Sequence, residues 1–356
     1  MIRTGKILKI IASVAGICVL GFILFLVVGV ILGKPSKGER ISRSHGIPHH
    51  LVIAHRGASY LAPEETRPAY VLARDMGAHY LEMDIQRTKD GTLVAFHDDI
   101  LDRTTNVASV FPGREKDPVH SFTIDELKQL DAGTWFNMLY PERAKKMFEG
   151  LRILTLDEVV DIAEDAENKP GLYIETKSAE QFPGIEKDIV QLLERRGWLE
   201  EGHPSIHNKN GDSQEQPSNL VTVGTGEARI IFQSFDLNSL IKLKELAPGV
   251  PRIYLVSQDM EKEQGWVNII RDAKETCTGL GPVGYLGWPW HVGEAHRNQL
   301  LIHLYTINSP WQYWLFSKFG VDGFFTDRCD KLMTFYDMML YKTPDVIMES
   351  IAGNSP

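Results

Sequence analysis

The sequence predicts an α/β fold, a closed barrel of eight parallel strands with helices around it. Two observations lead to this fold class. From residue 51 onward, short apolar runs alternate with longer amphipathic runs, which is typical of strands alternating with helices in a parallel sheet. Eight such units occur, enough to close the sheet into a distorted (β/α)8 TIM barrel whose active site lies at the carboxyl ends of the strands.

The N-terminus predicts a transmembrane helix outside the barrel. Residues 1–9 are basic, and residues 10–33 contain no charged side chain. A helix over this run is roughly 36 Å long at about 1.5 Å per residue, enough to cross a bilayer. A cleaved signal peptide is the main alternative, and a buried core helix is another. A signal peptide normally has an apolar region of about 7–15 residues followed by a small-residue cleavage site, and neither feature is evident.

We therefore expect a single-pass membrane protein with an uncleaved anchor. Basic residues flank both ends of the apolar run, so the positive-inside rule does not fix its orientation. We expect the catalytic part on the extracytoplasmic side.

The remaining chain divides by composition. Residues 34–50 are polar and contain Gly, Ser and Pro, which predicts a linker. The barrel is expected over residues 51–335, with an insertion subdomain at residues 98–151, and a C-terminal tail follows at residues 336–356. Residues 199–228 are polar and predict a surface loop. The net charge of −9 argues against nucleic acid as a partner, because binding to phosphate backbones requires a basic face.

The barrel elements follow from the periodicity of apolar residues. Candidate strands are residues 51–55, 80–85, 171–176, 229–233, 252–256, 279–285, 301–307 and 322–326. Candidate helices between them are residues 64–76, 155–165, 184–196, 237–246 and 310–319, and one further helix at 123–130 lies in the insertion.

A ninth apolar run at residues 93–97 requires a different connection. The connection to the second strand region consists of little more than residues 89–92, and a parallel crossover needs a dozen or more residues. Asp90 and Gly91 form a hairpin turn signal. We expect this run to fold back antiparallel on the second strand.

Chemically active side chains recur where successive strands end. They are His55, Arg56, Glu82, Asp84, His97, Glu175 and Lys177. Side chains at positions i and i+2 of a strand point the same way. Glu82 and Asp84 therefore share one face of the strand, and the apolar Met83 and Ile85 share the other. The apolar face must pack against the helices, so we expect Glu82 and Asp84 to face the barrel interior.

This set predicts a metal-dependent reaction on a phosphate ester. Glu82, Asp84 and Glu175 are hard oxygen ligands, which suit Mg²⁺ or Ca²⁺ better than Zn²⁺. His55 and His97 could supply the general base and the general acid. The positively charged Arg56 and Lys177 could bind the phosphate oxygens, and a divalent ion could neutralise the phosphodiester.

Ten short blocks resemble motifs of the glycerophosphodiester phosphodiesterase family, and they occur in the same order along the chain as in that family. They are HRGAS at 55–59, APEET at 62–66, YLEMDIQ at 80–86, TKDG at 88–91, VAFHD at 94–98, DAGTWF at 131–136, IETK at 174–177, QSF at 233–235, YTIN at 305–308 and VDGFFTD at 321–327. One position departs from the family pattern, because Glu65 stands where the family usually has Asn.

The resemblance implies hydrolysis of a glycerophosphodiester to sn-glycerol 3-phosphate and an alcohol. It implies that Glu82, Asp84 and Glu175 bind the metal, that His55 and His97 are the acid–base pair, and that Arg56 contacts the phosphate. Two alternatives stay open. One is a lysophospholipase D or sphingomyelinase-D-like enzyme acting on a lysophospholipid, and the other is an inactive module that binds a phospholipid headgroup.

Overall fold

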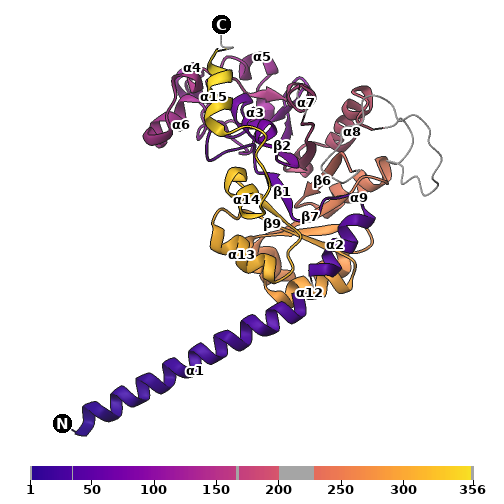
Figure 1. Cartoon of the computed structure of the whole chain (residues 1–356). Coiled ribbons are helices and arrows are strands. Elements are labelled where there is room, and N and C mark those ends of the chain that lie inside the picture. The colour runs from indigo at the N-terminus through magenta and orange to yellow at the C-terminus, as the bar shows by residue number, and fades with distance from the viewer. Residues whose placement is uncertain (1, 34, 166–167, 200–227, 354–356) are drawn as a thin grey trace.

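The computed structural model describes residues 2–33, 35–165, 168–199 and 228–353 (Figure 1). The surface loop expected at residues 199–228 falls almost entirely outside the described residues. The described part contains one ten-stranded sheet, surrounded by helices that connect most of its strands.

Eight of the ten strands form the predicted parallel barrel. Their order around the barrel follows the chain, and β1 closes it by pairing with both β2 and β10. They are β1 (Leu51–Ala54), β2 (Tyr80–Arg87), β5 (Gly171–Thr176), β6 (Ile230–Ser234), β7 (Arg252–Val256), β8 (Gly279–Pro282), β9 (Leu301–Leu304) and β10 (Gly323–Thr326). These strands are buried on both faces, which explains their nearly continuous apolar runs. The predicted TIM-barrel architecture is confirmed.

The remaining two strands extend the sheet beside the barrel mouth. Strand β3 (Leu93–Ala95) pairs antiparallel with β2, as predicted from the short connection, and places Ala95 opposite Ile85. Strand β4 (Leu154–Thr155), which the sequence did not predict, pairs antiparallel with β3. Strand β3 runs back along β2, and the Phe96 amide donates a hydrogen bond to the Asp84 carbonyl at 2.8 Å, so His97, two residues beyond the end of β3, follows beside Asp84.

Five helices around the barrel begin and end within three residues of the predicted positions. They are α3 (Arg67–Met76), α7 (Leu156–Glu164), α8 (Ile185–Arg195), α9 (Leu237–Leu246) and α13 (Pro310–Lys318). Four further helices were not predicted, namely α10 (Gln258–Gln264), α11 (Trp266–Ala273), α12 (Pro289–Arg297) and α14 (Cys329–Phe335). Short 3₁₀ turns follow β5 and β8, namely η4 (Ala179–Gln181) and η5 (Gly284–Leu286). Thr155 and Glu158 form a capping box at the start of α7, which satisfies amide groups that lack helical partners.

The insertion after β3 is built from short helices and turns. They are α4 (Val107–Val110), η1 (Val119–Ser121), α5 (Ile124–Leu127), α6 (Thr134–Leu139), η2 (Pro141–Arg143) and η3 (Lys146–Phe148). Leu101, Val107, Phe122 and Leu130 pack with Val94 and Phe96 of the hairpin segment in a hydrophobic cluster separate from the main core.

The N-terminal segment forms one continuous helix, α1 (Ile2–Gly33), which projects from the barrel beside α12 in Figure 1. Phe25 packs against Trp288 and Phe319, with ring centroids 5.6 and 5.8 Å away. Within the part of the chain that the structure describes, no helix combines the length and apolar character needed to cross a membrane. The predicted helix is present, but a transmembrane anchor at residues 10–33 is not supported, and Phe25 contacts protein.

Two segments expected to be irregular form helices. Residues 35–44 of the expected linker form α2 (Pro35–Ser44), whose Ile41 and Ser42 are buried against the barrel. Residues 344–353 of the expected tail form α15 (Pro344–Gly353), which packs against α3 and buries Ile347. Helix α2 has a single large apolar residue, Ile41, whereas half of the residues of α15 are apolar. Packing against the rest of the fold stabilises both short helices.

Candidate active site

The ends of four neighbouring strands bring the predicted side chains to the barrel mouth. His55 and Arg56 follow β1, and Glu82 and Asp84 lie in β2. Glu175 is the next-to-last residue of β5, Lys177 follows that strand, and His97 follows the hairpin strand β3. Asp84 and Glu175 are direct partners in the parallel register, so their side chains share the interior face.

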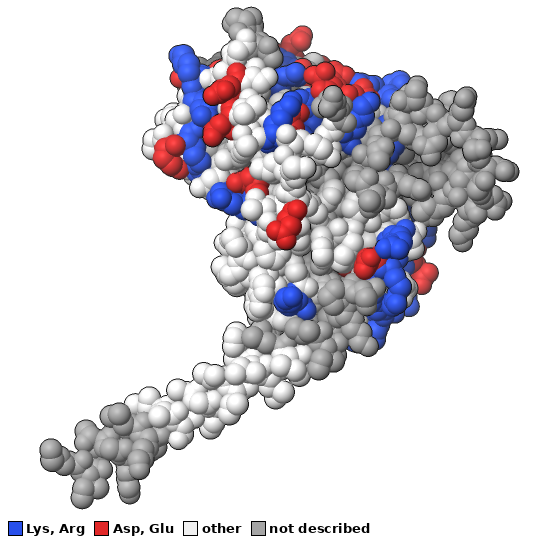
Figure 2. All heavy atoms as spheres, in the orientation of Figure 1, with Lys and Arg blue, Asp and Glu red and all other residues white. Residues whose placement is uncertain are grey.

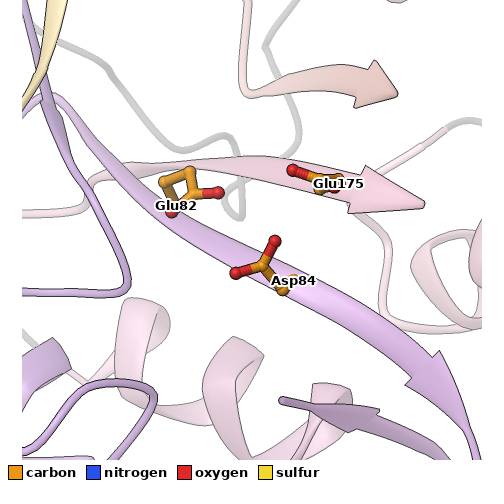
Figure 3. A group of neighbouring side chains, drawn as sticks. All are labelled: Glu82, Asp84 and Glu175. Carbon is orange, nitrogen blue, oxygen red and sulfur yellow. The ribbon is translucent and has the colours of Figure 1, made fainter. Parts of the chain in front are cut away.

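Three buried carboxylates form the centre of the site. Glu82, Asp84 and Glu175 each offer an oxygen atom within 4.8 Å of the others, and Figure 3 shows them on β2 and β5. They are 2, 1 and 5 % exposed. Burial and the repulsion from Asp84 raise the pKa of Glu175 to about 8 and that of Glu82 well above its usual range. Carboxylates so close together and so well buried are stable in their ionised form only beside a compensating cation.

The two predicted cationic residues contact this cluster. The Arg56 amide donates to Glu82 Oε2 at 2.8 Å, and its Nε lies 3.3 Å from Asp84 Oδ2. Lys177 Nζ lies 3.4 Å from Asp84 Oδ1 and 3.2 Å from Glu175 Oε1. Burial alone would raise the pKa of Asp84, but Lys177 and Arg56 outweigh burial and lower it.

Each histidine is paired with a carboxylate through Nδ1. His55 Nδ1 lies 2.7 Å from Asp327 Oδ1, and His97 Nδ1 lies 2.6 Å from Asp98 Oδ1. Burial opposes ionisation of Asp327, but its hydrogen bond with His55 outweighs burial and lowers its pKa to about 2. An ionised partner accepts a hydrogen bond, so Nδ1 carries the proton in both imidazoles. Each Nε2 is then the atom that can exchange a proton with a substrate.

Both imidazoles lie near the carboxylate cluster. His55 and His97 each act electrostatically on Asp84 and lower its pKa. The structure therefore brings the two predicted histidines, the three carboxylates, Arg56 and Lys177 to one mouth. Two histidines beside an acidic cluster and two cations can bind a phosphate group and move protons on either side of it.

The sequence interpretation gave no role to several residues of this site. Asp98 and Asp327 were visible within family-like blocks, but their pairing with histidines was not. Glu64 accepts hydrogen bonds from Arg56 at 2.9 Å and from Arg103 of the insertion at 2.6 Å, and Arg103 also donates to Asp98. The only available signal was the position of Asp98 and Asp327 next to strand ends.

The position that departs from the family pattern lies at the edge of the cluster. Glu65 is 4 % exposed, and its Oε1 accepts a hydrogen bond from the Asp84 amide at 3.0 Å. Tyr70 donates its hydroxyl hydrogen bond to Oε2. Burial, with repulsion from Asp84 and Glu82, raises the pKa of Glu65 well above its usual range.

The donor set also fits a hard divalent cation. Three carboxylates with ligand atoms in one small region are oxygen ligands of the kind that Ca²⁺ and Mg²⁺ prefer. A bound divalent cation would offset the repulsion that raises the pKa values of Glu82 and Glu175.

Comparisons with known proteins show the family of this chain. Residues 55–331 match the glycerophosphoryl diester phosphodiesterase family model. A glycerophosphodiester phosphodiesterase of Bacillus subtilis is 34 % identical over 311 residues, which cover 87 % of this chain and 92 % of the relative. A glycerophosphodiester phosphodiesterase of Caldanaerobacter subterraneus is 31 % identical over a region that covers 80 % of this chain and 96 % of the relative.

Solved structures show the same fold. A putative glycerophosphoryl diester phosphodiesterase of Silicibacter pomeroyi superposes with a TM-score of 0.65 at 22 % identity, covering 86 % of this chain and 99 % of its own. An Oleispira antarctica phosphodiesterase in complex with the product sn-glycerol-3-phosphate superposes with a TM-score of 0.58 at 25 % identity, covering 81 % and 97 %. With the family model matched across the barrel and the B. subtilis relative similar over most of its length, the chain belongs to the glycerophosphoryl diester phosphodiesterase family and is a phosphodiesterase.

Proposed function

We propose that the chain hydrolyses glycerophosphodiesters to sn-glycerol 3-phosphate and an alcohol, using Ca²⁺ or Mg²⁺ held by Glu82, Asp84 and Glu175. One observation carries this proposal. Two imidazoles, each paired through Nδ1 with a carboxylate, lie beside a buried cluster of three carboxylates at the mouth of the barrel. The product complex of the Oleispira antarctica neighbour supports the substrate class.

The side chains divide the reaction between them. Arg56 and Lys177 bind and orient the phosphate oxygens, and one histidine Nε2 removes the proton from the attacking oxygen. Attack by water gives sn-glycerol 3-phosphate directly, whereas attack by the substrate's glycerol 2-hydroxyl gives a cyclic phosphate, which a water molecule must then open to sn-glycerol 3-phosphate. A bond forms between that oxygen and phosphorus, and the bond from phosphorus to the alcohol oxygen breaks. The other histidine Nε2 gives its proton to that oxygen. When bound, the divalent ion supplies charge stabilisation for the phosphate oxygens.

Turnover of glycerophosphocholine by the full chain, with and without a chelator, tests the proposal. We expect release of sn-glycerol 3-phosphate and choline, loss of turnover with the chelator, and recovery when Ca²⁺ or Mg²⁺ is added back. Full activity in the presence of the chelator would contradict metal dependence. Binding of glycerophosphocholine with no turnover under any condition would favour the inactive headgroup-binding module instead.

Lysophospholipase D or sphingomyelinase-D-like activity is a second candidate, because apolar side chains are exposed in the insertion. Met138 and Leu139 of α6 are 80 and 60 % exposed. Exposed apolar side chains of this kind could contact an acyl chain. A comparison of lysophosphatidylcholine with glycerophosphocholine distinguishes the two activities. Higher kcat/KM for the lysophospholipid, reduced selectively by Met138→Ser with Leu139→Ser, would favour the second candidate.

Location at a membrane, with the catalytic part on the extracytoplasmic side, stays a prediction. Its support is the surface of α1, where Ile11, Ile17 and Leu24 are more than 60 % exposed and no charged residue occurs between residues 10 and 33. In Figure 2 the part of this stretch that is not grey is white, without acidic or basic side chains. Fractionation of cells that express the full chain tests lipid association, and protease protection tests the side. Recovery of the full chain only in the soluble fraction would contradict the prediction.

A further inference from the structure

One buried amide beside the carboxylate cluster has no role in the reaction as described above. Gln233 lies in β6, where its register partner on β5 is Glu175. The shared register directs both side chains to the barrel interior. Gln233 is 1 % exposed, and its Nε2 donates a hydrogen bond of 2.8 Å to Glu82 Oε1. Gln233 therefore lies next to two of the three carboxylates.

The oxygen atom of the same amide is unsatisfied. Gln233 Oε1 is buried and accepts no hydrogen bond from any of the described residues. Its register partner on the other side, in β7, is Ile253, which offers no polar side-chain group. A buried acceptor without a partner destabilises a fold by about 1–3 kcal/mol. Such an atom is expected to meet a ligand or a bound water.

We propose that Gln233 is a fourth protein ligand of the divalent cation, binding it through Oε1 while Nε2 holds Glu82 in place. This inference rests on the metal site of the proposed function. Ca²⁺ and Mg²⁺ both accept the carbonyl oxygen of a side-chain amide. A neutral ligand also suits this position, because a fourth carboxylate would add to the repulsion among Glu82, Asp84 and Glu175.

The two ends of the amide then perform complementary tasks. The Nε2 donor fixes one oxygen of Glu82, and the Arg56 amide fixes the other at 2.8 Å. Glu82 is thereby held from both sides, and the amide oxygen of Gln233 is left for the cation. Groups that orient metal ligands typically change metal affinity by about 10–100-fold when they are removed.

Terbium luminescence tests the proposal on the full chain. Tb³⁺ serves as a probe for the Ca²⁺ site, and its lifetimes in H₂O and D₂O give the number of water molecules bound to the ion. If Gln233 binds the ion, Gln233→Met gains one bound water relative to the natural chain. Calorimetry should also show Ca²⁺ affinity lowered by about 10-fold or more. An unchanged water count in Gln233→Met would overturn the proposal, even if the affinity fell.

A second variant and a control keep the test decisive. Gln233→Glu retains an oxygen ligand, so its water count should equal that of the natural chain, and one extra water would contradict direct binding. Ser239→Ala removes another fully buried polar group, whose Oγ lies 2.8 Å from Thr176 Oγ1, and should leave the water count and Ca²⁺ affinity unchanged. If the water count follows the proposal but the natural chain does not cleave glycerophosphocholine, the proposed function fails and this inference stands.

Discussion

In the reaction that we propose, proton transfer depends on two histidine–carboxylate pairs at the barrel mouth. Asp327 holds His55 and is itself held by Asn308, whose Nδ2 donates to Oδ2 at 2.6 Å, and by Ser59, whose hydroxyl donates to Oδ1 at 3.0 Å. Asp98 holds His97 in the same way. With the proton on Nδ1, each imidazole is held in the single tautomer whose Nε2 faces the substrate without a proton. Binding of the substrate then does not have to select this tautomer from a mixture.

Replacing either histidine should abolish most of the activity. We expect His55→Gln and His97→Gln each to lower kcat by about 10²–10⁴-fold, because each removes one proton-transfer group. Ca²⁺ affinity should change little, since neither imidazole belongs to the carboxylate cluster. His120→Gln, at an exposed histidine of the insertion, is the matched control. Steady-state turnover of glycerophosphocholine measures the effect, and natural-level turnover in both variants would disprove the site assignment.

Removing the charge of Asp327 should reduce turnover while the three carboxylates still bind the divalent cation. Asp327→Asn keeps the size of the side chain but no longer favours a proton on His55 Nδ1, so we expect kcat to fall by about 10²-fold or more. Asp330→Asn, which changes a carboxylate of α14 that is paired with Arg328, is the control. Equal kcat values for the two variants would show that Asp327 does not position His55.

Two elements outside the eight barrel strands contact the two ends of the barrel: β3 of the β2–β3 hairpin at the mouth, and α2 at the opposite end. The β2–β3 hairpin runs back along β2 and brings His97 to the mouth beside Asp84, because the connection is too short for a crossover helix. At the opposite ends of the strands, α2 lies against Asp322, which precedes β10 and accepts hydrogen bonds from His296 Nε2 at 2.9 Å and from the Ile302 amide at 2.8 Å.

The contact between α2 and Asp322 requires a glycine. A Cβ atom at Gly38 would lie 1.7 Å from Asp322 Oδ1, so Gly38→Ala must displace α2 or the buried carboxylate. We expect a loss of about 1–3 kcal/mol in the free energy of unfolding, measured by urea denaturation. Gly353→Ala in α15 is the control, because among the described residues no atom outside its own helical turn lies within 4 Å of the added methyl group. Similar stability for both variants would mean that α2 does not dock as described.

The stability of the whole barrel is linked to pH through two buried imidazoles. Burial lowers the pKa of His79 and of His303 to about 4, so both stay neutral in the folded chain. His79 Nδ1 accepts a hydrogen bond from the Val52 amide at 3.0 Å, which only an unprotonated nitrogen can do. In the unfolded chain both would take up protons near pH 6.5.

Acid should therefore destabilise the fold between about pH 6.5 and 4. In this window the unfolded chain binds protons that the folded chain does not, so the contribution of His79 is full above pH 6.5 and is lost as pH falls. A pKa difference of about 2.5 corresponds to about 3 kcal/mol. We expect His79→Gln to lose less stability than the natural chain between pH 7 and 4.5, by urea denaturation at each pH. Equal losses in both chains would contradict this linkage.

Short-range sequence patterns were sufficient to predict the eight strands, the hairpin and the seven side chains of the mouth. Alternation within one strand fixes which side chains share a face, and the end of a parallel barrel strand fixes where they point. Contacts between distant segments were not predictable in this way. Asp327 reaches His55 across 272 positions of sequence, and Gln233 reaches Glu82 across 151. Closing the barrel brings these partners together, and the burial that comes with closure gives α2 and α15 their structure and shifts the pKa values of the carboxylates.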